Sequence, residues 1–395
     1  MSRHLLRLCT AFAVAAAIVA PAGSSPIASA QAGCRPPPLR AEPAVPWAQQ
    51  LLAPSQVWDV TRGKGVTVGV VDTGVDATTP QLAGAVRPGL DTSAPGNGPG
   101  NADCLGHGTF VAGIIGARPA AGTGFAGVAP ESTILPIRDT FTERDGSPRS
   151  MARGIRAAAD AGAGVINVSA STNHDDPVLH SAVQYAQQHD SLVVAAAANN
   201  AERGNPVPYP AAYPEVLAVG AIDFTGAVAG FSQTGGFVGL TAPGVDVVSL
   251  GPGGPGQWQQ SGTSFATPFV SGAAALVRSH RPELDAAAVR ARLEATATRP
   301  GVAVPDDAAG WGTVDPRAAV TATLPGGDAA SGGERPAAPL PEPPGPGATE
   351  VVLISVAGAA LLSCAAALAA KIASSGRKRG WRRRRITVVD TQREP

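Results

Sequence analysis

The sequence lacks the short motifs that mark several common kinds of enzyme and binding site. It has no His-Glu-x-x-His pair, no Cys-x-x-Cys pair and no glycine-rich phosphate loop. These absences argue against a zinc protease, a cysteine-based metal or thiol redox centre, and a P-loop nucleotide hydrolase. No internal repeat is visible along its 395 residues.

Metal-ligand patterns are equally scarce. The acidic residues do not gather in a dense loop of the kind that holds calcium. Four histidines have no cysteine or histidine at ligand spacing, and we expect them at the surface: His174, His180, His189 and His280. The sequence therefore predicts neither a bound metal nor a cofactor.

The N-terminal thirty residues have the pattern of an export signal. Arg3 and Arg7 precede an apolar run over residues 8–20, and Ala28-Ser29-Ala30 fits a cleavage site before Gln31. Residues 1–30 are therefore interpreted as a signal peptide, followed by a short N-terminal extension over residues 31–54.

A second apolar segment lies near the C-terminus. Residues 351–370 carry no charge, and as a helix they would span about 30 Å, the thickness of a bilayer core. A segment rich in proline and glycine over residues 324–349 precedes them and is too poor in bulky apolar residues to fold. We therefore predict a linker at 324–349 and, at 350–371, a transmembrane helix in contact with the lipid bilayer.

The basic tail over residues 372–395 sets the predicted orientation. The formal net charge of the chain is zero, so this tail follows a near-neutral remainder. Basic residues stay on the cytoplasmic side of a membrane, which predicts an extracytoplasmic main domain and a cytoplasmic C-terminus. Beside an apolar helix, such a run indicates contact with anionic lipid, and we expect no nucleic acid partner.

Four cysteines limit the possible disulfides. Cys9 falls in the signal peptide and Cys364 in the predicted membrane helix, which leaves Cys34 and Cys104 as the candidates for a disulfide in the exported part. Lipidation of Cys34 is the alternative, because two small residues precede it. Gln31 stands where a lipidation signal usually has an aliphatic residue, and a second anchor would be redundant.

Three segments place an aspartate, a histidine and a serine in contexts that suit catalysis. The apolar, β-rich run at 66–72 ends in Asp72, and the C-terminal ends of buried parallel strands commonly carry active-site groups. His107 stands between two glycines at the start of a predicted helix. Ser264 precedes the Ala-rich run at 269–277, which predicts a buried helix with this serine near its first turn.

Each residue alone has an ordinary structural explanation, since a serine at a helix start is usually an N-cap. Together they supply what nucleophilic acyl transfer requires. A serine hydroxyl needs an imidazole to take its proton, and the imidazole needs a carboxylate to hold its tautomer.

The sequence around these residues resembles the subtilisin-like serine protease family, peptidase family S8. The matching motifs are Val-Val-Asp-Thr-Gly, Gly-His-Gly-Thr and Gly-Thr-Ser-Phe-Ala-Thr-Pro, in the family's order. The resemblance implies an α/β protease domain over residues 55–323, with a mostly parallel central sheet flanked by helices. It implies a serine endopeptidase acting on proteins or peptides, with Ser264 as nucleophile, His107 as acid and base, and Asp72 as the group that orients His107.

The same resemblance implies further site residues. Asn199, after an apolar strand, matches the asparagine that stabilises the oxyanion, although Ala198 replaces the usual glycine and Asn200 is the alternative. The residues that match the substrate-binding edge are Ser169, Ala170 and Ser171.

The ends of the chain resemble a narrower group, the mycosins, which are membrane-anchored proteases of actinobacterial type VII secretion. The features are residues 46–52, the residues around Cys104, the proline-rich linker and the single C-terminal helix with its basic tail. This resemblance implies a type VII secretion membrane complex as partner. A scaffold with dispensable proteolysis and a general surface protease are the alternatives. Mycosins usually carry a second disulfide, for which no cysteines remain here.

Overall fold

The computed structural model describes residues 34–93, 99–140, 147–324, 371–372 and 375. The predicted signal peptide, and nearly all of the predicted linker, membrane helix and tail, lie outside these residues. Within the described part, no helix is both long and apolar enough to cross a bilayer. The chain divides into two units, residues 1–333 and 334–395, and the described strands all belong to the first.

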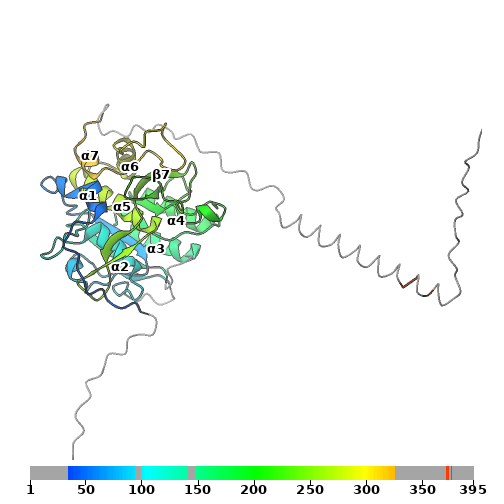
Figure 1. Ribbon diagram of the computed structural model, residues 1–395, viewed down its shortest axis with the longest axis horizontal. Helices are drawn as coiled ribbons and strands as arrows, with labels where there is room; N and C mark the ends of the chain where they lie inside the picture. Colours follow the sequence, from blue (N-terminus) through cyan, green and yellow to red (C-terminus); the bar gives the residue numbers. More distant parts are fainter. Residues whose placement is uncertain (1–33, 94–98, 141–146, 325–370, 373–374, 376–395) are drawn as a thin grey trace, which may run out of the picture. The chain divides into compact units, whose positions relative to one another are not determined.

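A seven-stranded parallel sheet runs through this unit (Figure 1), in the order β2-β3-β1-β4-β5-β6-β7. In that order the strands are Leu90–Asp91, Thr133–Arg138, Thr67–Asp72, Val165–Val168, Leu192–Ala196, Leu217–Ile222 and Val238–Pro243. The predicted α/β fold with a mostly parallel sheet is confirmed. Since all strands run the same way, their C-terminal ends meet at one edge, where polar side chains can gather.

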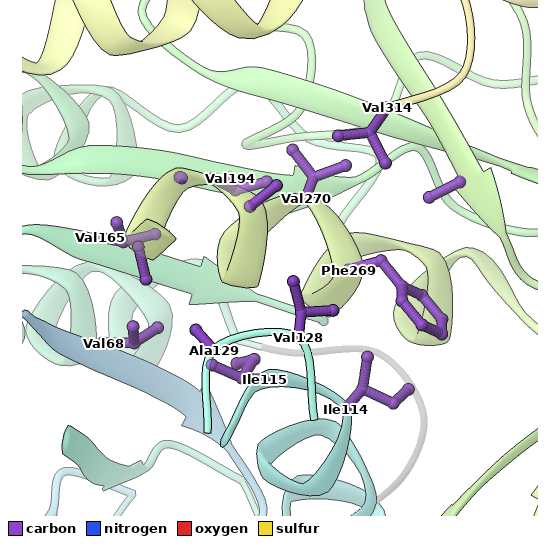
Figure 2. Packing of buried hydrophobic residues seen from close by; sticks show 14 of the residues in the cluster. Val68, Ile114, Ile115, Val128, Ala129, Val165, Val194, Phe269, Val270 and Val314 are labelled. Carbon is purple, nitrogen blue, oxygen red and sulfur yellow. The ribbon is translucent and has the colours of Figure 1, made fainter. Parts of the chain in front are cut away.

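Helices cover both faces of the sheet. α2 (His107–Gly116) and α5 (Thr263–His280) pack on one face, and α3 (Pro148–Asp160) and α4 (Pro177–Gln188) on the other. Strand β1 serves both layers, because alternate side chains point to opposite faces. Val68 and Val70 join the α2–α5 layer and Val71 joins the α3–α4 layer. Figure 2 shows part of the first layer, with side chains from strands and from α5 in one cluster.

The Ala-rich run behaves as predicted. Every residue from Phe265 to Val277 of α5 is buried, so this part of the helix is enclosed on all sides. Small side chains let it lie close to several strands of the sheet at once. Its first turn, with Ser264, is thereby fixed at the edge where the strands end.

The remaining helices and strands surround this core. The helices are α1 (Trp47–Leu52), η1 (Pro54–Val57), η2 (Pro80–Leu82), η3 (Ala201–Arg203), α6 (Ala286–Ala295) and α7 (Pro316–Thr321). The strands β8 (Val247–Leu250) and β9 (Gln257–Gln260) form an antiparallel pair.

The segment before α1 is held against strand β9. Cys34 and Cys104 form the predicted disulfide, which uses the thiol that lipidation of Cys34 would need. The backbone of Arg40 accepts a 3.0 Å hydrogen bond from the N–H of Gln257, and the Arg35 guanidinium stacks on Trp258, 4.2 Å from its centroid. The disulfide thus joins the N-terminal extension to the loop that leads into α2.

Replacing Cys34 and Cys104 together with alanine should lower the free energy of unfolding by about 4 kcal/mol, because the unfolded chain regains the freedom lost to a closed loop. The two cysteines are 70 residues apart. Urea unfolding followed by tryptophan fluorescence measures the change. Wild-type protein in reductant should unfold like the double variant. An unchanged midpoint in both would show that the disulfide adds no stability.

Candidate active site

Asp72 and His107 meet at the edge where the parallel strands end. Asp72 is the last residue of β1 and His107 the first of α2, and Nδ1 of the imidazole lies 2.7 Å from Oδ1 of the carboxylate. The same oxygen accepts a 2.7 Å hydrogen bond from the backbone N–H of Thr73. Asp72 is only 3% exposed, so its carboxylate is shielded from water and its Oδ1 interacts with the imidazole instead.

The position after His107 requires a glycine for a steric reason. A Cβ atom on Gly108 would stand 2.0 Å from the carbonyl oxygen of Gly74, which follows β1. Only a residue without a side chain lets the start of α2 come this close to the end of β1.

Asp103, to which the sequence analysis assigns no role of its own, holds the two segments together. Its Oδ1 accepts from the Thr73 hydroxyl at 2.9 Å and the Gly106 N–H at 2.8 Å. Its Oδ2 accepts from the Thr109 N–H at 2.8 Å and hydroxyl at 2.7 Å. Burial raises the pKa of Asp103, although these hydrogen bonds oppose the shift. The visible signal was an acidic residue in the loop just before the Gly-His-Gly motif.

Ser264 is the second residue of α5, and the residue after it contacts the histidine. The ring of Phe265 is 5.1 Å from the ring of His107, centroid to centroid. The Ser264 hydroxyl donates to the carbonyl oxygen of Ser169 at 3.0 Å, and the Ser169 hydroxyl donates to the carbonyl oxygen of Ser264 at 3.2 Å. Pro268 explains the second bond, because it has no N–H for the carbonyl four residues earlier. The end of β4 is thus tied to the first turn of α5.

Asn199 follows β5 and faces the same helix start. Its Oδ1 accepts 2.9 Å hydrogen bonds from both the N–H and the hydroxyl of Thr263, so its amide nitrogen is turned to the other side. The N–H of Asn200 instead donates to the Gln233 side chain at 3.1 Å. Ala198 has φ +68°, the left-handed region where glycine is relaxed. The side chain of Asn199 therefore contacts the residue just before Ser264.

The predicted substrate-binding edge directly follows β4, and its first residue, Ser169, is buried. Thr172 pairs with Tyr209 through backbone hydrogen bonds of 2.9 and 2.8 Å. Ala170 and Ser171, which precede it, belong to no strand pair in the described part of the chain and are half-buried. An extended peptide could therefore add alongside them.

A second buried carboxyl group, also not singled out from the sequence, lies beside Asp72. Asp139 is 2% exposed, and its backbone N–H donates to the Asp72 carbonyl oxygen at 3.0 Å. Among the described residues, neither of its carboxyl oxygens has a hydrogen-bond partner, and the same is true of Oδ2 of Asp72. Burial, and then the charge of Asp72, raise the pKa of Asp139 to about 8, against the lowering effects of its own backbone N–H, of His107 and of Arg153.

The histidines outside this site have local structural partners where the contacts are given. His180 pairs with Glu215 at 3.1 Å and stacks on Tyr213, with ring centroids 4.2 Å apart. Nδ1 of His189 lies 2.8 Å from the carbonyl oxygen of Tyr185. Within the described residues, no three His, Cys, Asp or Glu side chains are grouped so as to hold a metal ion.

Comparison with known proteins identifies the same class as the sequence motifs. The model of the subtilase family matches residues 63–312. Mycosin-4 of Mycobacterium tuberculosis is 37% identical over 376 residues, which is 83% of this chain and 81% of the relative. Mycosin-1 of Mycolicibacterium smegmatis is 36% identical over 337 residues, which is 71% of this chain and 74% of the relative.

A solved structure shows the same similarity in three dimensions. The crystal structure of MycP1 from the ESX-1 type VII secretion system is 34% identical, with a TM-score of 0.66. The match covers 74% of this chain and 90% of that one.

Replacing Asp103 with asparagine should lower the free energy of unfolding by about 2–3 kcal/mol. The carboxylate has two acceptor oxygens, each with two donors, whereas the amide has only one acceptor oxygen and would leave some of these donors without a partner. Four hydrogen bonds depend on this carboxylate. Urea unfolding measures the loss. The same change at the exposed Asp59 is the control and should cost less than about 1 kcal/mol. Equal stability of both variants would exclude a bridging role for Asp103.

Proposed function

The chain belongs to the subtilase family of serine proteases, and we propose that it cleaves peptide bonds through Asp72, His107 and Ser264. The observation that supports this most directly is the 2.7 Å contact between Asp72 and His107, with the first turn of α5 beside the imidazole.

In the proposed reaction, Oγ of Ser264 attacks the carbonyl carbon of the scissile bond. The hydroxyl must first turn from the Ser169 carbonyl oxygen, to which it now donates, toward Nε2 of His107. His107 takes the proton and then gives it to the leaving amine. Asp72, bonded to Nδ1, keeps the tautomer that frees Nε2 for this exchange and stabilises the positive ring. Water then hydrolyses the acyl-enzyme by the same proton route.

We assign the oxyanion to the side-chain N–H of Asn199 and the backbone N–H of Ser264. Thr263 holds Oδ1 of Asn199, which fixes the amide with its nitrogen on the far side. The Ser264 N–H lies in the first turn of α5, where backbone donors have no helical partner. Substrate backbone would pair along Ser169–Ser171.

The cellular setting in the proposal is type VII secretion. The disulfide and the similarity to mycosins indicate an extracytoplasmic protein. We propose that residues 350–371 anchor it in the cell membrane, with residues 372–395 in the cytoplasm, and that it associates with a type VII secretion complex. The mycosin similarity, which extends over most of the chain, supports this setting.

Replacing Ser264 with alanine should abolish peptide hydrolysis and labelling by a fluorophosphonate probe, because the attacking oxygen is gone. The expected fall in kcat is on the order of 10⁶, the loss that removal of this serine causes in subtilisin, a relative. Ser261→Ala is the matched control, since Ser261 binds Asp246 instead and should leave both signals intact. Labelling that persists in Ser264→Ala would assign the nucleophile elsewhere.

The same variant separates the proposed role from its alternatives. If secretion fails on deletion of the protein but persists with Ser264→Ala, the essential role is structural support of the complex. If the purified protein cleaves peptides yet binds no secretion-channel subunit, it is a general surface protease.

Replacing Asn199 with alanine should lower kcat by about 10²–10³ with little change in KM, because the donor acts on the oxyanion formed during reaction. This magnitude comes from subtilisin. Asn200→Ala is the control and should retain near-normal kcat. If the two variants exchange these behaviours, Asn200 is the oxyanion donor.

A further inference from the structure

Asn167 is a buried polar residue that has no role in the mechanism proposed above. It lies on β4 among Val165, Ile166 and Val168, and it is fully buried. Alternate residues of a strand share a face, so its side chain lies on the same face as Val165, which packs in the α2–α5 layer. An amide enclosed among apolar side chains is costly unless its polar atoms have hydrogen-bond partners. The partners of Asn167 therefore indicate what the amide does.

Both polar atoms of this amide are hydrogen-bonded. Nδ2 donates to the hydroxyl oxygen of Ser169 at 2.8 Å, and Oδ1 accepts from the hydroxyl of Ser271, on α5, at 2.9 Å. The Ser169 hydroxyl in turn donates to the carbonyl oxygen of Ser264 at 3.2 Å. These three hydrogen bonds form one chain, which begins inside α5, passes through β4 and ends on the backbone of the proposed nucleophile.

The direction of the three bonds explains why the residue at position 167 is an amide. A serine hydroxyl has one hydrogen, and that of Ser169 is donated to Ser264, so the other neighbour of Ser169 must be a donor. The neighbour of Ser271 must be an acceptor, because Ser271 donates. An amide supplies a donor and an acceptor without a charge. An ionised carboxylate has only acceptors, and an apolar side chain has neither.

We propose that Asn167 is a positioning residue, which acts through the Ser169 hydroxyl to hold the backbone of Ser264 in place for attack. This role rests on the proposed function of Ser264 as nucleophile. Two hydrogen bonds join Ser169 and Ser264, and the one that the Ser264 hydroxyl donates is lost when this hydroxyl turns toward His107. The bond that Ser169 donates uses only the Ser264 carbonyl oxygen. It therefore persists and keeps the main chain fixed while the side chain rotates.

The test compares kcat, KM and the rate of fluorophosphonate labelling in Asn167→Leu and Ser169→Ala, made in the full-length protein. Leucine has a similar size and suits the apolar layer, but it cannot hydrogen-bond. Both variants should lower kcat and the labelling rate by about 10–100-fold, because a small displacement of the attacking oxygen slows the reaction strongly. KM should change little, since the backbone groups of the substrate-binding edge remain. Ser169→Thr, which keeps a hydroxyl, should recover most of the rate.

Ser191→Ala is the matched control. Ser191 is also buried, and its hydroxyl donates to the carbonyl oxygen of Ala163 at 2.7 Å, before β5 and β4 begin. The change thus removes the same kind of bond at the opposite edge of the sheet. It should lower the midpoint of urea unfolding, as Ser169→Ala does, and leave kcat unaltered. Wild-type kcat in both Asn167→Leu and Ser169→Ala would overturn the proposal.

A second measurement does not depend on turnover. The amides of Thr263 and Phe265, in the first turn of α5, are hydrogen-bonded at 2.9 and 3.0 Å. Their hydrogen exchange should be faster in Ser169→Ala than in wild-type protein or Ser191→Ala, and equal exchange in all three would also overturn the proposal.

Two outcomes are separated by these measurements. If Asn167→Leu does not fold, Ser271→Ala takes its place with the same expected result, because it removes the bond that fixes Oδ1 of Asn167. If wild-type protein takes no label at Ser264, the proposed protease mechanism fails. The exchange rates then decide whether the chain of hydrogen bonds still holds the first turn of α5.

Discussion

The whole site depends on how closely the end of β1 approaches the start of α2. This distance is set by the absence of a side chain at Gly108, which would otherwise collide with the backbone of Gly74. Asp103 then fills the space between the two segments with hydrogen bonds to both. The 2.7 Å bond between Asp72 and His107 follows from this framework, because neither residue must move to reach the other. Rigid supports of this kind let a catalytic contact form without an entropy cost at each turnover.

The helix that carries Ser264 is fixed by different means. Its apolar residues are buried against the sheet, and its first turn is tied to β4 and β5 through Ser169 and Asn199. Because Pro268 has no N–H, the carbonyl oxygen of Ser264 has no helical partner and accepts instead from the Ser169 hydroxyl, just after β4. The three candidate catalytic side chains thus come from separate elements, each positioned by contacts with the backbone of another.

Much of this could be predicted from the sequence. Apolar runs ending in Asp72 and before Asn199 predicted parallel strands, and the small-residue run after Ser264 predicted a buried helix, because burial on all sides leaves a plain compositional pattern. Asp103 and Asp139 could not be recognised this way. A single acidic residue after a strand or in a loop usually faces water, and only the folded chain shows that these two are enclosed. The predicted signal peptide, linker and membrane helix remain predictions from composition.

The path of the N-terminal extension could not be predicted from the sequence either. Its hydrogen bond to strand β9 joins backbone groups, which every sequence has. Its disulfide to the loop before His107 has a consequence for maturation of the protein. Cleavage of the chain anywhere between the two cysteines would leave both fragments covalently joined. A processed molecule would therefore migrate as an uncut chain under non-reducing electrophoresis, and its shortened N-terminal piece would separate only after reduction.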